Sequence, residues 1–285
     1  MPFTCLERFS TVADRYDVVL CDIWGVVHNG LAAHRAACDA LVRFRAGGGT
    51  VILITNAPRP SPWVIHQLDR FGVPPAAYDG VMTSGDVTRE VVAGRNGAVF
   101  HIGPERDVTI FDGLGVRFAP VDEAAYTVCS GLFDDTTETP DHYRDLMATM
   151  RGRGLFMVCA NPDLVVERGN ELLYCAGAIA DLYGSMGGEV LYAGKPHRPI
   201  YEAALAKAAA ARGAAAPAGR TLAIGDSLRT DIAGARALGI DGLFVSGGIH
   251  AEELGSRESA STAALAGIFA NAGITPHAVT PRLMW

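Results

Sequence analysis

Near the start of the chain, a short apolar run ends in an aspartate and then a glycine, in the segment CDIWG at residues 21–25. The run before it, YDVVL at residues 16–20, is short and rich in apolar side chains, as is typical of a strand buried in a parallel sheet. Ligands of open α/β sheets bind beyond the carboxyl ends of such strands. Asp22 is therefore predicted to lie in an active site, where a carboxylate can act as a nucleophile.

Three later segments repeat this pattern of a polar group directly after a β-rich run. Thr55 and Asn56 follow the run TVILI, Lys195 follows EVLYAG, and Asp226 and Asp231 belong to the segment GDSLRTD after TLAI. In a parallel sheet the ends of such strands meet at one edge, so these residues are expected to serve one site.

Between these segments, short apolar runs alternate with helical patterns, which is typical of βαβ units and predicts an α/β fold with a parallel sheet. Apolar spacing, proline and glycine predict helices over residues 34–45, 61–71 and 139–150. The alanine-rich segment that follows residue 203 predicts a helix up to Arg212. Strands are predicted over residues 16–20, 50–54, 98–102, 126–129 and 155–159.

The spacing of the polar segments predicts two domains. Asp22 and Thr55 are separated by about one βαβ unit, as are Lys195 and Asp226. Thr55 and Lys195 are separated by enough sequence for a whole domain. We therefore predict a discontinuous core of residues 1–81 and 190–285, with a second α/β domain of residues 82–189 inserted into it.

Charge and composition exclude several classes of protein. The net charge of −7, a pI near 5.6 and the lack of a basic run argue against nucleic-acid binding. No segment is long and apolar enough to predict a membrane helix, and no membrane partner is expected. The six cysteines lack metal-ligand or disulfide spacing and are interpreted as reduced. The expected location is the cytoplasm.

In this order, the four segments resemble the motifs of the haloacid dehalogenase superfamily, and within it the phosphatase subgroup that carries a large α/β cap. The resemblance implies a Rossmann-like parallel sheet with residues 82–189 as the cap. It also implies a Mg²⁺ ion held by Asp22, Asp226 and the backbone carbonyl of Trp24, with Asp231 in the second shell. Carboxylate and carbonyl oxygens are the donors that Mg²⁺ prefers. The oligomeric state is left open, with a homodimer through the cap as the assembly to test.

The same resemblance suggests roles for the remaining residues. Lys195 would supply positive charge to a phosphoryl group, and Thr55 its hydroxyl together with the backbone amide of Asn56. The plain alternatives are a solvated lysine and a turn, and for Asp226 and Asp231 helix capping.

A further segment, Asn161-Pro162-Asp163, follows the run LFMVCA and resembles the loop that this subgroup turns toward its substrate. Asn161 and Asp163 are thus predicted substrate-binding residues. An ordinary Asn-Pro turn is the alternative.

Trp24 departs from the family pattern, because phosphatases of this family carry a second aspartate at that position. An indole cannot act as a general acid, which is worth roughly 10² to 10⁴ in rate. The rate of hydrolysis would fall least for substrates with good leaving groups, such as acyl and aryl phosphates. Trp24 is itself a predicted substrate-binding residue, and packing in the core is the plain alternative. His28 is a candidate replacement acid, with a hydrogen-bonding role in the loop or a substrate contact as alternatives.

Three functions of different classes remain open from the sequence. The first is a Mg²⁺-dependent hydrolase of a small phosphorylated metabolite, acting through an aspartyl-phosphate on Asp22. The second is a phosphate-binding or sensing protein that lost turnover with the acid. The third is a metal-independent dehalogenase-like hydrolase, which Asp226 and Asp231 disfavour because displacement at carbon does not need them.

Overall fold

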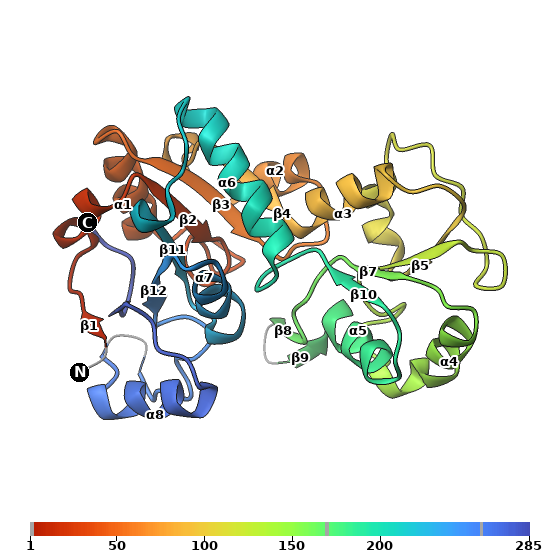
Figure 1. The fold of residues 1–285 in the computed structure, drawn as a ribbon. Helices are drawn as coiled ribbons and strands as arrows, with labels where there is room; N and C mark the ends of the chain where they lie inside the picture. The colour runs from red at the N-terminus through yellow and green to blue at the C-terminus, as the bar shows by residue number, and fades with distance from the viewer. Residues whose placement is uncertain (1–2, 169–170, 257–258) are drawn as a thin grey trace. The chain divides into compact units, whose positions relative to one another are not determined.

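The computed structural model describes residues 3–168, 171–256 and 259–285 of the chain (Figure 1). The chain divides into two compact units, each assembled from separate segments. The first unit contains Met1–Thr55, Pro62–Met82 and Pro196–Trp285, and the second contains Asn56–Ser61 and Thr83–Lys195.

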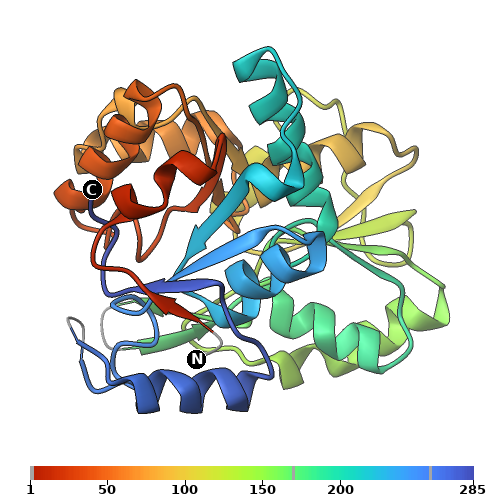
Figure 2. The ribbon, with the colours of Figure 1, turned by 60° about the vertical axis from the view of Figure 1, so that its left-hand side comes forward.

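Within the described residues, the sheet of the first unit has seven strands in the order β1-β13-β12-β11-β2-β3-β4. Each neighbouring pair for which the register is known is parallel. The N-terminal strand pairs with the last one, so that both ends of the chain contribute to one edge of this sheet (Figure 2). The strands are β1 (Thr4–Cys5), β2 (Val18–Asp22), β3 (Thr50–Thr55), β4 (Gly80–Thr83), β11 (Thr221–Gly225), β12 (Asp241–Val245) and β13 (Ala278–Thr280).

The helices of this unit are α1 (Arg35–Ala46), α2 (Ser61–Phe71), α6 (Arg198–Arg212), α7 (Ala233–Leu238) and α8 (Thr262–Ala272). Helices α1 and α6 both pack against β3. Helix α6 ends where the sequence predicts, because Gly213 takes a left-handed conformation (φ 66°) that stops it. Strands β2 and β11 are buried along their whole length, which explains why they are continuous apolar runs.

A second parallel sheet forms the centre of the other unit, in the order β10-β7-β6-β5. Helices α4 and α5 and strands β6 and β7 enclose a core rich in methionine and tyrosine, including Met147, Met157 and Tyr183. Strands β8 and β9 form a separate antiparallel hairpin. The elements are α3 (Ser84–Ala93), β5 (Val99–Ile102), β6 (Tyr126–Cys129), α4 (Arg144–Gly152), β7 (Met157–Cys159), β8 (Val165–Arg168), β9 (Glu171–Tyr174), α5 (Ala176–Ser185) and β10 (Val190–Tyr192).

The limits of the second unit differ from the predicted range of residues 82–189. Strand β10 pairs with β7, so the second unit continues to Lys195 instead of ending at residue 189. The short segment Asn56–Ser61 also belongs to the second unit. The predicted helix over residues 139–150 begins as a 3-10 turn at Pro140–Tyr143 and becomes α-helical only from Arg144.

All six cysteines are free thiols, and only Cys5 is exposed. In the part of the chain that the structure describes, none of the helices combines the length and the hydropathy needed to span a bilayer.

Candidate active site

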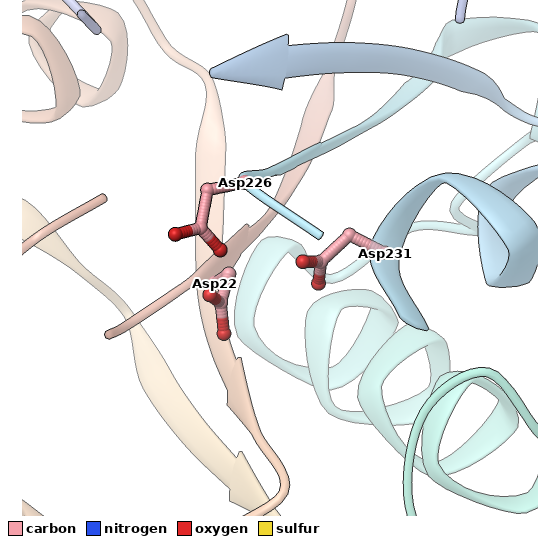
Figure 3. Close-up of side chains that lie close together, drawn as sticks. All are labelled: Asp22, Asp226 and Asp231. Atoms are coloured by element: carbon pink, nitrogen blue, oxygen red, sulfur yellow. The ribbon is translucent and has the colours of Figure 1, made fainter. Parts of the chain in front are cut away.

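Three buried carboxylates from different elements of the first unit lie together (Figure 3). Asp22 is the last residue of β2, Asp226 follows β11, and Asp231 lies in the π-helical turn Leu228–Ile232. One oxygen from each carboxylate lies within 4.8 Å of the others. Their exposed fractions are 7%, 5% and 2%. The structure thus brings together the three aspartates that the sequence selected.

The strand order explains why they meet. Strands β2 and β11 are neighbours, and the chain continues from β2 to β3 on one side and from β11 to β12 on the other. This divergence is a topological switch point, where the loops beyond the strand ends separate and leave room for a ligand. Thr55 ends β3, one residue beyond the partner of Asp22 in the register.

Glycines make the space that these carboxylates occupy. A Cβ atom on Gly25, whose φ is +80°, would lie 2.0 Å from Asp226 Oδ2, and a Cβ on Gly248 would lie equally close to that oxygen. A Cβ on Gly225 would lie 2.1 Å from Cγ of Asp231. At these positions any larger residue would have to displace a carboxylate.

Backbone donors fix the orientation of two of the three side chains. The Ile249 N–H donates to Asp226 Oδ2 at 2.8 Å, and the Ser227 N–H donates to Asp231 Oδ2 at 3.2 Å. Ser227 itself caps the following turn by accepting from the Thr230 N–H. Helix capping, the plain alternative for Asp226, is therefore performed by its neighbour.

The chemistry of this group fits a divalent cation. Three carboxylates buried side by side repel one another, and burial in a low-dielectric environment strengthens that repulsion. A hard cation with oxygen ligands removes it. Asp22 and Asp226 are the predicted ligands, and Asp231, oriented by Ser227, is suited to hold a ligating water.

Sequence reasoning missed the loop after β12. Gly248 and Ile249 complete the surroundings of Asp226, although neither carries a charged side chain. The available indication was the Ser246-Gly247-Gly248 segment, which directly follows an apolar strand as the other site segments do.

Four other predicted site residues belong to the second unit: Asn56, Asn161, Asp163 and Lys195. The Lys195 N–H donates to Asn56 Oδ1 at 2.7 Å. The Asn56 amide nitrogen donates to the Lys195 carbonyl at 3.0 Å and to Asp163 Oδ1 at 2.9 Å. Both amide hydrogens of Asn56 are thereby used, so its side chain holds Lys195 and Asp163 in place, and only its backbone N–H remains as a predicted phosphate donor.

The Asn161-Pro162-Asp163 segment is a locally closed turn. Asn161 Oδ1 accepts from the Asp163 N–H at 3.1 Å, which is an Asx-turn. The turn predicted as the plain alternative is thus present, and the link from Asp163 to Asn56 gives it a fixed place after β7.

Replacing Asn56 with alanine is expected to lower the free energy of unfolding by about 1–3 kcal/mol, because it leaves the buried Lys195 N–H and carbonyl without the Asn56 side chain. Urea unfolding followed by circular dichroism measures the change. The matched control is Asn271→Ala at an exposed position of α8, where less than about 0.5 kcal/mol is expected. Equal small effects at both positions would contradict a clamping role for Asn56.

Trp24 and His28 form an aromatic pair in the loop after β2. Trp24 is 46% exposed, so the interpretation of this residue as core is wrong. Its ring meets His28 edge to face, with centroids 5.3 Å apart. His28 is 3% exposed, and its Nδ1 accepts from the Gly30 N–H at 3.0 Å.

This environment makes His28 unsuitable as a replacement acid. Burial, assisted by the neighbouring His34, lowers the pKa of His28 to about 4. The ring is therefore neutral at physiological pH, and protonating Nδ1 would break the bond from Gly30. A neutral imidazole is a very weak acid, so its role in the loop is that of a hydrogen-bond acceptor and packing partner.

Two parts of the chain match models of known protein families. Residues 19–117 match the family described as haloacid dehalogenase-like hydrolase, and residues 192–271 match a family described as HAD-hydrolase-like. A hydrolase of the haloacid dehalogenase-like family from Brucella suis 1330 is 48% identical in sequence. Its crystal structure superposes with a TM-score of 0.85, covering 98% of this chain and all of that one.

Two further similarities involve glycerol phosphate phosphatases from Mycobacterium tuberculosis. The D-glycerol 3-phosphate phosphatase is 29% identical over 248 residues, and this alignment covers 85% of the present chain but only 66% of that enzyme. The crystal structure of a glycerol phosphate phosphatase in complex with calcium is 25% identical, with a TM-score of 0.64 over 84% of this chain and 68% of that one.

Proposed function

Because this chain belongs to the haloacid dehalogenase-like hydrolases, we propose that it is a Mg²⁺-dependent phosphohydrolase that acts on a small phosphorylated metabolite through Asp22. The observation that carries the proposal is the group formed by Asp22, Asp226 and Asp231, whose oxygens approach within 4.8 Å while all three are buried. The similarity to glycerol phosphate phosphatases supports phosphorus as the site of attack.

In this proposal Asp22, Asp226 and the backbone carbonyl of Trp24 would hold Mg²⁺, and Asp231 would hold a water bound to it. When bound, the cation supplies positive charge that offsets the repulsion between the carboxylates and the phosphoryl oxygens. The calcium complex of the mycobacterial relative supports a divalent ion in this family.

The reaction of Asp22 has two displacements. One carboxylate oxygen attacks phosphorus while the bond from phosphorus to the leaving-group oxygen breaks, which forms an aspartyl-phosphate. Water then attacks that phosphorus, releases inorganic phosphate and restores the carboxylate of Asp22. The proposal assigns Lys195, the Thr55 hydroxyl and the Asn56 backbone N–H to the phosphoryl oxygens, and Asn161 and Asp163 to the rest of the substrate.

Trp24 limits which substrates react well. No carboxylic acid stands two residues after the nucleophile, and His28 is neutral and already accepts a hydrogen bond. The leaving group must therefore depart without help from either residue. We propose that good leaving groups are favoured for this reason.

The test is inorganic phosphate release from acetyl phosphate by the wild-type protein, with Mg²⁺ and with a chelator. Mg²⁺-dependent release supports the proposal. Binding of phosphate and Mg²⁺ without release would favour the sensing function, and chloride release from a 2-haloacid without metal would favour the dehalogenase.

Mg²⁺ is expected to raise the melting temperature of the wild-type protein, because a ligand that binds only the folded state stabilises it, by about 2.7 kcal/mol at a hundred times its Kd. Asp226→Asn should weaken this shift, because it removes one of the three carboxylate charges of the group. Differential scanning fluorimetry measures both. The control is Asp39→Asn on the exposed face of α1, which should keep the full shift. A full shift in Asp226→Asn would place the bound ion elsewhere.

We also propose a cytoplasmic location, which the six free thiols support, since such thiols persist in reducing compartments. The proposed assembly is a homodimer through the second unit. The hairpin of β8 and β9 supports it by exposing Val165, Leu172 and Tyr174. Sedimentation velocity of the protein and of a Leu172→Glu variant tests this assembly.

A further inference from the structure

The loop after β2 leaves its largest apolar side chain exposed to solvent. Ile23, Val26 and Val27 are at most 3% exposed, whereas the neighbouring residue Trp24 is 46% exposed. Exposing an indole while burying its small neighbours loses hydrophobic stabilisation, which scales with the apolar area removed from water. This exposed surface begins two residues after the predicted nucleophile Asp22.

The exposed indole is nevertheless held in place. A Cβ on Gly30, whose φ is +85°, would lie 2.4 Å from the Trp24 ring, so the ring rests directly against the glycine backbone. Its edge-to-face partner His28 is itself packed on Phe71, with ring centroids 4.8 Å apart. The Gly25 N–H also donates to the His28 carbonyl at 2.9 Å, which closes the loop that carries both rings.

These contacts use part of the indole and leave the rest as a rigid, flat and apolar surface. Aromatic rings associate in offset-stacked or edge-to-face geometries beyond the gain from buried area alone. A surface that is fixed before binding loses little conformational entropy when a planar ligand covers it. A planar aromatic group therefore fits it better than a flexible polyol does.

The chemistry of the site leads to the same class of ligand. Without a general acid at this position, the leaving group must carry away the electron pair of the broken P–O bond as an anion. An aryl oxide can do so because its ring delocalises the charge, whereas an alkoxide cannot. Trp24 thus stands at the position of the general acid, and its indole suits aromatic leaving groups, which can depart without being protonated.

We propose that the Trp24 indole is a stacking surface for the leaving group, and that the substrates are phosphate monoesters of planar aromatic alcohols. This inference rests on the proposed function. In the step concerned, a bond forms between Asp22 and phosphorus, the P–O bond to the aromatic ring breaks, and the aryl oxide takes its proton from solvent. The second displacement by water is unchanged.

The kinetic test compares 2,4-dinitrophenyl phosphate with acetyl phosphate, which have leaving groups of similarly low basicity but only one aromatic ring. The measured quantity is the ratio of kcat/KM for the aryl ester to kcat/KM for acetyl phosphate. Trp24→Leu should lower this ratio by about fivefold or more, which is within the range of aromatic pair interactions. Trp24→Phe should restore most of that ratio. Trp63→Phe, at a 55% exposed tryptophan of α2, is the matched control and should leave the ratio unchanged. Equal losses for both substrates in Trp24→Leu would overturn the proposal.

A binding experiment separates this inference from the proposed function. In binding calorimetry, the Asp22→Asn variant should bind phenyl phosphate with a Kd that is lower than its Kd for methyl phosphate by about fivefold or more. Adding Trp24→Leu to this variant should remove the difference between the two Kd values. Absence of phosphate release by the wild-type protein would overturn the proposed function while leaving this comparison decisive. Equal affinities for the two esters would overturn the stacking surface.

Discussion

Replacing Asp22 with asparagine is expected to lower phosphate release from acetyl phosphate by about 10⁴-fold or more, because an amide has no anionic oxygen with which to attack phosphorus. The substitution keeps the size of the side chain and leaves Asp226 and Asp231 in place. The thermal shift with Mg²⁺ should therefore be retained or only modestly weakened. Steady-state phosphate release and scanning fluorimetry on the same preparation measure the two effects.

Asp39→Asn provides the control for Asp22→Asn, since it removes a carboxylate from an exposed ion pair with Arg43. Its turnover should equal that of the wild type. Wild-type turnover in Asp22→Asn would exclude covalent catalysis by this residue, whatever the behaviour of the metal.

Replacing Trp24 with aspartate is expected to raise hydrolysis of glycerol phosphate relative to acetyl phosphate by about tenfold or more, within the range that general acids contribute. Glycerol phosphate has a poor alkoxide leaving group, whereas acetate leaves without protonation. Neither substrate has a ring, so loss of the indole surface does not affect the ratio of kcat/KM values, which is the measured quantity. Water that enters the space left by the indole will limit the gain.

Trp24→Asn is the matched control for this gain, because it has the size of aspartate without the acid. Both variants must show a Mg²⁺ shift and a cooperative unfolding transition. An equal rise of the ratio in both variants would mean that the smaller side chain, and not the restored acid, produces it.

The first sheet and its site were largely predictable from local sequence. Buried parallel strands are continuous apolar runs, and the polar group that ends each run is visible without knowledge of the rest of the chain. Asp22 and Thr55 end neighbouring strands, as predicted. Strand β6 covers the predicted residues 126–129.

The boundary at Lys195 could not be predicted in this way. Strand β10 reads as apolar whichever sheet it joins, and only its pairing with β7 decides that it belongs to the second unit. Pairing between strands distant in sequence depends on the whole packed structure, which a local pattern does not contain.

The role of the Asn56 side chain could not be predicted from the sequence for a similar reason. Next to Thr55 it suggests a phosphate contact, but its two amide hydrogens bind Lys195 and Asp163, both more than a hundred positions away in the chain. Trp24 was open to several interpretations from sequence, because exposure depends on neighbours such as Gly30.

The close packing of Gly25, Gly225 and Gly248 against Asp226 and Asp231 has a consequence for the interpretation of natural variation. At each position even an added methyl group would displace a carboxylate, and Gly25 also requires a backbone conformation that other residues adopt only with strain. A missense change at one of these glycines can therefore inactivate the protein while every charged residue stays intact. The site is therefore expected to tolerate substitutions at these three glycines as poorly as substitutions at the aspartates themselves.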